Sequence, residues 1–172
     1  ATRGPDELIV EEPMLIRLDG HDISSTMRTP GHDFELAAGF CLAEGVLAQQ
    51  PIVAIRYCGT DTAAETDFNV VTVDTGGQAP EPKARLGSTT SSCGLCGVEA
   101  IGELTDRLRQ LPGYEPWPID LLLSLPELAR TQQGLFDATG SVHGAAAFDR
   151  SGNLMVSRED IGRHNAVDKV VG

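Results

Sequence analysis

The chain has 172 residues, 41% of them hydrophobic and 22% charged, so it can bury a sizeable core as a globular protein without disulfide bonds. It has 13 Lys and Arg against 25 Asp and Glu, and this net charge of −12 argues against a general nucleic-acid or anionic-membrane surface. No apolar run approaches the roughly 20 residues of a membrane helix, and residues 1–7 contain no signal-peptide core, so we predict a cytoplasmic protein. The chain lacks an initiator methionine, so we expect it to be processed, trimmed or a fragment.

The first elements are predicted to form a short β meander over residues 8–28. Residues 8–10 and 14–18 are strand-like apolar runs. Asp19-Gly20 is a hairpin-turn dipeptide, and residues 23–27 are the expected returning strand.

A helix is predicted to follow, beginning after Thr29 and ending at Gly45. Thr29 is a suitable N-cap and Pro30 suits the first helical turn. Asp33 and Glu35 complement the positive end of the helix dipole. Gly45 is the expected C-terminal cap.

The middle of the chain is predicted to hold two strands and a boundary. The strand candidates are residues 52–58 and 68–73. A turn at 74–77 opens a segment rich in Gly, Pro, Ser and Thr that reaches residue 90. We therefore predict an N-terminal α+β lobe over residues 1–84 and a core over residues 85–172.

The four cysteines are of two kinds. Without an export signal, a disulfide framework is not expected. Cys41, inside the predicted helix, and Cys58, at the end of a predicted strand, are interpreted as buried small hydrophobes. Cys93 and Cys96 form a Cys-x-x-Cys pair with a glycine after each cysteine, and an amphipathic helix is predicted over residues 98–111 behind them.

Three interpretations of the cysteine pair are open. In the first, the pair performs sulfur transfer or thiol redox chemistry, because a helix N-terminus favours the reactive thiolate. Cys93 would hold sulfur as a persulfide, and Cys96 would resolve it, share the sulfur or position the first thiol. In the second, the pair binds zinc with His143 or His164, although the spacing matches no standard zinc motif. In the third, two reduced thiols have no role.

The C-terminal third is predicted to alternate helix and strand. Residues 124–127 match a capping box that would open a helix over residues 125–133. The remaining predictions are a buried strand of small residues at 142–148, a turn at 149–153, a strand at 154–156, a lead-in at 157–160 and a last helix at 161–171.

The histidines and the last helix offer candidate binding residues. His143 is by default a core histidine, and the small residues around it leave a pocket role as the alternative; His21 and His32 receive no role. Asp160, His164 and Asp168 recur every four residues on one predicted helix face. Together with Arg158 and Arg163, this face is either simply solvated or binds a phosphate or a guanine-containing ligand.

Four blocks of sequence carry a family resemblance. They are MRTPGHDFELAAGF at 27–40 with Glu44-Gly45, SCGLCG at 92–97, TGSVHGAA at 139–146 and REDIGRHNAVDK at 158–169. Together and in this order they resemble the formate dehydrogenase accessory sulfurtransferase family. A Cys-x-x-Cys pair alone is a weak signal, whereas four ordered blocks are highly specific.

The resemblance implies a role in maturing molybdenum- or tungsten-dependent formate dehydrogenase. Members of the family take sulfur as a persulfide from a cysteine desulfurase and pass it to the bis-guanine-dinucleotide form of the molybdenum cofactor. Cys93 matches the persulfide-forming cysteine and Cys96 its partner. We further expect a homodimer, no resident metal, and cofactor contacts by His143, Arg158, Asp160, Arg163 and His164.

The resemblance also implies a fold. The family core resembles cytidine deaminases, so we expect an α/β protein whose mixed sheet has flanking helices, with this core incomplete. The zinc-deaminase signature is absent, because His143 follows the cysteine pair and Ala145 stands where its glutamate would be. Ser141 replaces a usual second glycine.

Family members also continue well beyond Lys169, through a motif implicated in cofactor binding, so we expect this chain to be a fragment or the cleaved part of a longer protein. The competing hypothesis is a noncatalytic module that docks to formate dehydrogenase and binds a metal or cofactor through Cys93 and Cys96.

Overall fold

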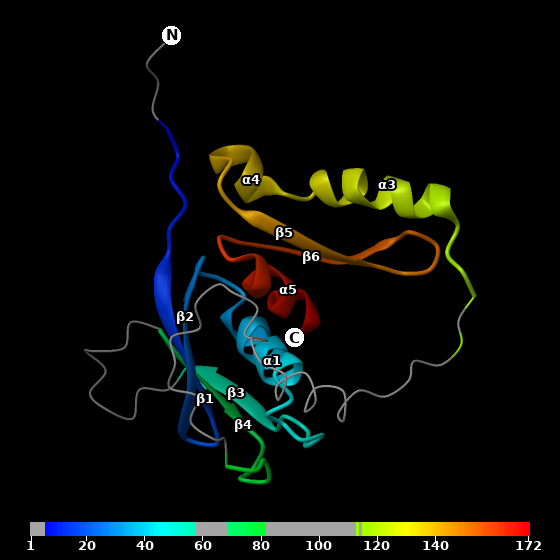
Figure 1. Cartoon of the computed structure of the whole chain (residues 1–172). Helices are drawn as coiled ribbons and strands as arrows, with labels where there is room; N and C mark the ends of the chain where they lie inside the picture. Colours follow the sequence, from blue (N-terminus) through cyan, green and yellow to red (C-terminus); the bar gives the residue numbers. More distant parts are fainter. Residues whose placement is uncertain (1–5, 58–68, 82–112, 114) are drawn as a thin grey trace, which may run out of the picture.

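The structure is a computed structural model that describes residues 6–57, 69–81, 113 and 115–172 (Figure 1). The Cys-x-x-Cys pair, Cys58 and the predicted helix at 98–111 lie outside the described residues. The strands are β1 (Glu12–Leu18), β2 (His21–Arg28), β3 (Ala54–Tyr57), β4 (Val70–Asp74), β5 (His143–Phe148) and β6 (Leu154–Asp160). The helices are α1 (Asp33–Ala43), α3 (Ile119–Arg130), α4 (Gly134–Thr139) and α5 (Arg163–Val171).

The N-terminal strands form a mixed four-stranded sheet in the order β2-β1-β4-β3. β1 pairs antiparallel with β2 across the Asp19-Gly20 turn and parallel with β4, and β3 pairs antiparallel with β4. The predicted α/β class, a mixed sheet with flanking helices, is confirmed. The likeness to cytidine deaminases and the division at residue 84 stay predictions.

The hydrophobic core lies between this sheet and α1. Met14, Ile16 and Leu18 alternate along β1 and are fully buried, because every second side chain of a strand faces the same side. The core is completed by Val71 and Val73 of β4, by Leu36, Ala37 and Cys41 of α1, and by Leu47.

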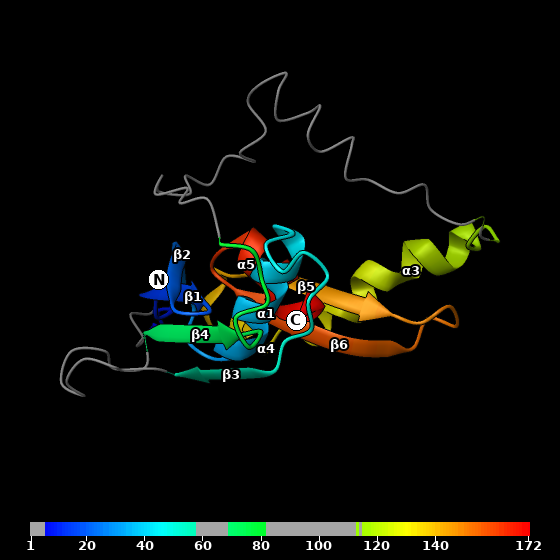
Figure 2. The same cartoon turned by 90° about the horizontal axis from the view of Figure 1, so that it is seen from below.

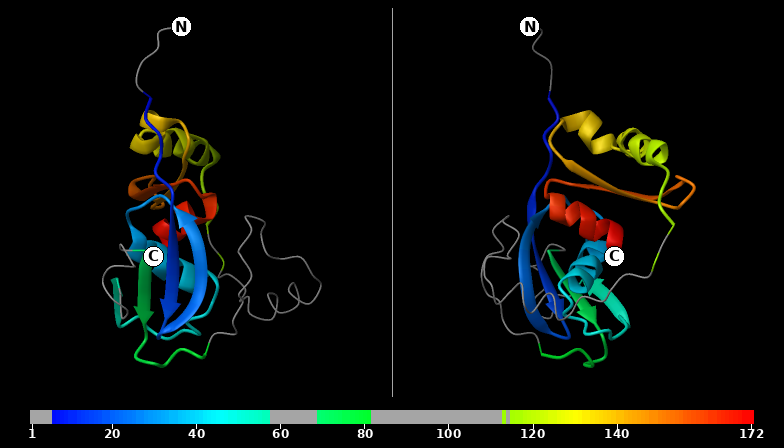
Figure 3. Two further views of the ribbon diagram at one scale, coloured as in Figure 1. Left: turned by 90° about the vertical axis from the view of Figure 1, so that its left-hand side faces the viewer. Right: turned by 45° about the vertical axis from the view of Figure 1, so that its right-hand side comes forward.

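Two helices separate the sheet from the β5–β6 hairpin. Figures 1 and 3 show α3 and α4 on one side of the hairpin, α5 on its other side, and α1 beyond α5 against the four-stranded sheet. Figure 2 shows the same arrangement from below, with β3 and β4 running past α1. A Cβ at Gly39 of α1 would lie 1.9 Å from the Asp168 carbonyl oxygen of α5. Glycine is therefore required where the two helix backbones meet.

Several boundaries differ from the prediction. Residues 8–10 form no strand, although they are apolar, because they pair with no strand among the described residues. Residues 157–160 do not lead into the last helix; they extend β6, in which Asp160 pairs with His143 of β5. The prediction for Gly45 is confirmed, since it follows α1 with φ 67°.

The predicted helix starts were also wrong. Thr29 does not cap α1; its hydroxyl oxygen accepts from the Ile161 N–H at 3.0 Å, and His32 takes the N-cap position. The capping box at Ser124 lies inside α3, where the Ser124 hydroxyl donates to the Leu121 carbonyl at 2.7 Å. Leu121 and Leu125 contact the hairpin turn at Gly152. This packing stabilises a helix that begins at Ile119, ahead of the predicted start, and continues through Pro126.

Candidate functional site

The five predicted cofactor-binding residues all lie near the β6–α5 junction. Asp160 ends β6 and is fully buried. Its Oδ2 accepts from the Lys169 ammonium at 2.7 Å and from the Thr29 N–H at 3.1 Å. Its Oδ1 accepts from the Gly162 N–H at 2.8 Å and from the Asn165 amide at 3.0 Å. Asp160 thus fastens the junction to the loop before α1.

Lys169 and Asn165 complete this fastening from α5. The Lys169 ammonium also donates to the Thr29 carbonyl at 2.8 Å, and the Asn165 amide donates to the Met27 carbonyl at 2.8 Å. The side chains of Lys169 and Asp160 are 1% and 0% exposed, so this is a buried ion pair with further hydrogen bonds. The contacts join residues far apart in sequence and fix the walls of an adjoining hollow.

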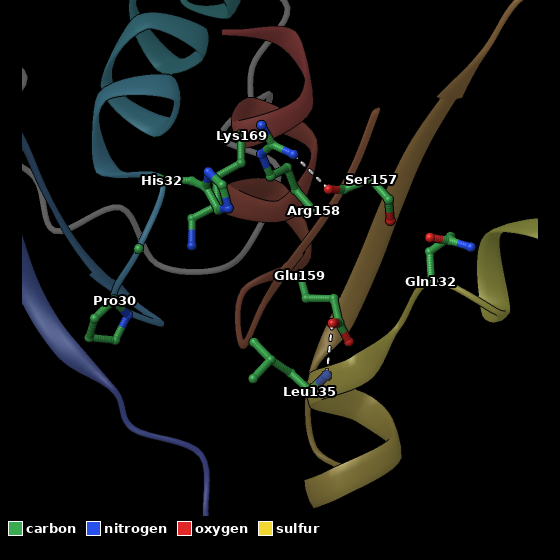
Figure 4. A pocket seen from close by; sticks show the side chains of 9 residues that line it. Pro30, His32, Gln132, Leu135, Ser157, Arg158, Glu159 and Lys169 are labelled. Atoms are coloured by element: carbon green, nitrogen blue, oxygen red, sulfur yellow. Dashed lines mark hydrogen bonds between the residues drawn. The ribbon is translucent and has the colours of Figure 1, made fainter. Parts of the chain in front are cut away.

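The hollow has a volume of about 240 Å³ and lies beside β6 (Figure 4). The loop before α1 contributes Pro30, Gly31 and His32 to its lining, and α5 contributes Lys169. On the other side it is lined by Ser157, Arg158, Glu159, Gln132 and Leu135.

Arg158 is the predicted binding residue that lines this hollow. Its Nη1 donates to the Ser157 carbonyl at 2.9 Å, and its Nη2 donates to Glu35 Oε1 at 3.4 Å. Within the described residues, its buried Nε has no hydrogen-bond partner. A guanidinium with such unused hydrogen-bonding capacity suits recognition of an oxyanion.

Glu159 also lines the hollow, where it contacts the start of α4. Its carboxylate accepts the backbone N–H groups of Leu135 and Phe136 at 2.9 and 2.8 Å, at the start of α4. This contact ties α4 to the hairpin and closes one side of the hollow.

The other predicted residues are not brought to the hollow. His143 is exposed at the start of β5, so its default interpretation as a core histidine was wrong. Arg163 and His164 are exposed on the first turn of α5. Asp160 ends a strand, so it shares no helix face with His164. Cofactor contacts by these residues stay predictions.

The N-terminus of α1 is held in place by Arg28. This buried guanidinium pairs with the Asp33 carboxylate at 2.9 and 3.2 Å, and the Tyr57 hydroxyl donates to Asp33 at 3.3 Å. Since Asp33 is the first residue of α1, the network fixes the loop that carries His32.

Three titratable groups near α1 have shifted pKa values. Burial alone would raise the pKa of Glu35, but the hydrogen bond from His32 and the charge of Arg158 lower it. Burial raises the pKa of the Cys41 thiol to about 12, and the Asp168 charge adds to the effect, so Cys41 is the unreactive buried residue that was predicted. Burial, together with the charge of Glu44, raises the pKa of Asp168 to about 6.

Two further features are absent from the described residues. No group of three or more His, Cys, Asp or Glu side chains there is arranged to hold a metal ion. None of the helices in this part of the chain has the length and hydropathy needed to cross a bilayer.

Comparison with known proteins shows the family. The model of the FdhD/NarQ family matches residues 9–172. The chain belongs to the FdhD/NarQ family. The match includes residues 92–97 with the cysteine pair, the hollow-lining loop before α1, and the β6–α5 junction.

Relatives of known name agree with this membership. The "Sulfur carrier protein FdhD" of Streptomyces coelicolor is 45% identical over 98% of this chain and 62% of its own length. The protein of the same name from Mycobacterium tuberculosis is 43% identical over 98% of this chain and 64% of its own length. The chain therefore spans less than two thirds of the length of these relatives.

A solved structure resembles this FdhD/NarQ chain as well. It is the crystal structure of a provisionally assigned formate dehydrogenase accessory protein from Desulfotalea psychrophila. The two share 28% identity with a TM-score of 0.67, over 94% of this chain and 58% of the other.

Sequence reasoning missed three residues at the hollow. His32 and Glu35 belong to the first family block and Lys169 to the last, yet only the fold brings these two blocks together. A polar side chain at a position expected to be apolar was the available signal, because Lys169 lies on the buried face of α5 with Asn165 and Ala166.

Proposed function

We propose that this chain is a sulfur carrier for the maturation of formate dehydrogenase. One observation carries the proposal: the FdhD/NarQ match runs through the Cys-x-x-Cys pair at residues 93–96. The names of the relatives support the role in sulfur transfer, and the oxyanion-compatible hollow beside Arg158 supports binding of a phosphate-bearing cofactor.

In the proposed first step, sulfur moves from a cysteine desulfurase to Cys93. The Cys93 thiolate attacks the terminal sulfur of the desulfurase persulfide, and the desulfurase cysteine leaves as a thiolate. One S–S bond breaks and one forms, so the transfer needs no external oxidant or reductant.

In the proposed second step, Cys96 releases the sulfur for the bis-guanine-dinucleotide molybdenum cofactor, the substrate. The Cys96 thiolate attacks the Cys93 sulfur, a Cys93–Cys96 disulfide forms, and the terminal sulfur leaves as hydrosulfide. The two thiols supply the two electrons that reduce the sulfur, and a cellular dithiol then restores them. Arg158 is proposed to hold a cofactor phosphate, with Arg163, His164 and His143 on the neighbouring surface and Asp160 positioning the junction.

The proposal includes partners and location. The partners are a cysteine desulfurase, formate dehydrogenase and a second copy of the chain, and the location is the cytoplasm. The competing hypothesis is a docking module in which Cys93 and Cys96 bind a metal without transferring sulfur.

Intact mass spectrometry after incubation with a desulfurase and cysteine separates the two hypotheses. A sulfur carrier gains the mass of one sulfur atom, loses this gain in Cys93→Ala, and keeps it in the control Cys41→Ala, whose thiol is buried. Stoichiometric zinc with no sulfur adduct would instead support the docking module.

A further inference from the structure

His32 has a backbone conformation that is uncommon for residues other than glycine. Its φ of 56° and ψ of 36° place it in the left-handed region, directly before α1. Non-glycine residues stay in this region only where their surroundings hold them, and such residues cluster at functional sites. At His32 the neighbouring Arg28–Asp33 pair provides this hold.

The imidazole of His32 is oriented by Glu35. Its Nδ1 lies 3.0 Å from Glu35 Oε1. Within the described residues, Nε2 has no hydrogen-bond partner, and the side chain is 52% exposed and lines the hollow. A carboxylate on Nδ1 fixes the ring and leaves Nε2 as the nitrogen that meets a ligand.

The same carboxylate oxygen connects His32 to Arg158. Glu35 Oε1 accepts both from His32 Nδ1 and, at 3.4 Å, from Arg158 Nη2. The His32 ring, from the loop before α1, and the Arg158 guanidinium, from β6, are thus brought together at one wall of the hollow (Figure 4).

The remaining charges around the hollow are already engaged. Lys169 is neutralised by Asp160, and Glu159 accepts the two N–H groups at the start of α4. With a neutral imidazole, the negative charges of Glu35 and Glu159 outweigh the positive charge of Arg158. An anion therefore requires the protonated ring.

We propose that the hollow binds a phosphate group between the Arg158 guanidinium and the protonated Nε2 of His32, with Glu35 positioning both. The planar guanidinium and the imidazolium N–H are charge-assisted donors suited to phosphate oxygens. The inference rests on the proposed function only for the source of the phosphate, a guanine dinucleotide. The binding of phosphate in the hollow is argued independently of that function.

Histidine NMR during a pyrophosphate titration tests the proposal directly. The chain has four histidines, so four ring signals can be assigned by substitution. Pyrophosphate is expected to move the His32 signal, and binding is expected to weaken at a pH high enough for the ring to lose its proton. His32→Asn, which retains a residue tolerant of the left-handed region, is expected to weaken binding at acidic pH by roughly tenfold. Glu35→Gln is expected to reduce the pH dependence.

The control is His21→Asn, an exposed histidine at the start of β2, which should bind like the unaltered chain. The proposal is overturned if pyrophosphate does not bind, if it moves only other histidine signals, or if His32→Asn binds equally well. Guanosine diphosphate binding more tightly than pyrophosphate assigns the phosphate to a nucleotide, and equal affinity assigns it to the free ion; both support the site. A failure of pyrophosphate binding would not contradict sulfur transfer, because the Cys93 sulfur adduct tests that transfer separately.

Discussion

The four-stranded sheet and the β5–β6 hairpin differ in which side chains they bury. The sheet buries every second residue of β1 against α1, and this core holds apolar groups almost exclusively. In the hairpin only Asp160 is buried among the strand residues, and the apolar Met155 is 71% exposed. Apolar burial thus stabilises the sheet, whereas a polar network holds the hairpin in place, and the buried Nε of Arg158 has no hydrogen-bond partner among the described residues.

The largest effect is expected from breaking that polar network. Asp160→Ala would leave the Lys169 ammonium buried without its carboxylate, and we expect the free energy of unfolding to fall by about 4 kcal/mol. Denaturant unfolding measures the loss. The matched control is Asp137→Ala, which removes an exposed pair with Arg130 and should cost less than about 0.5 kcal/mol. Equal losses in the two variants would show that Asp160 does not fasten the hairpin.

The next effect compares two methionines, one in each region. Met14 is fully buried, so Met14→Ala should lower the free energy of unfolding by about 3 kcal/mol through lost burial and a cavity. Met155→Ala in the hairpin should change it by less than about 0.5 kcal/mol. Thermal unfolding of both variants checks the contrast, and a large loss from Met155→Ala would show that apolar burial stabilises the hairpin as well.

A smaller effect concerns the contact between α1 and α5. Burial raises the pKa of Asp168 from its ordinary value of 3.8 to about 6, so the folded state holds this proton more tightly than the unfolded state. Stability is therefore lost as the pH rises through about 6. Asp168→Asn should remove this loss and raise stability at alkaline pH by about 1 kcal/mol, after allowance for solvent screening. Unfolding curves that differ equally at acidic and alkaline pH would refute this assignment.

Sequence patterns predicted the elements whose cause is local. Alternation along residues 14–18 predicted β1, and the Asp19-Gly20 turn predicted the return into β2. Residues whose partners lie far away in the chain were misjudged. Thr29 looked like a helix cap, but its partners Asp160 and Ile161 come from the other end of the chain.

In the candidate site, too, residues with a local sequence signal were predicted and residues joined by long-range contacts were not. The family blocks indicated Arg158 and Asp160 as site residues. The helical spacing of Asp160 and His164 wrongly predicted that Asp160 lies on the last helix, because β6 extends to Asp160 and α5 begins only at Arg163. His32 and Glu35 gave no local signal of a site, because the contact to Arg158 crosses from α1 to β6. Cys93 and Cys96 lie outside the described residues, so their chemistry stays a prediction.

The most direct measurement of the central claim is the location of transferred sulfur within the chain. After incubation with a desulfurase and isotopically labelled cysteine, digestion under non-reducing conditions and mass spectrometry would assign the labelled sulfur to a peptide. We predict labelled sulfur on Cys93, accumulating further in Cys96→Ala because the resolving thiol is gone, and none on the buried Cys41. Labelled sulfur absent from the peptide with residues 93–96, or unchanged in Cys93→Ala, would contradict the account.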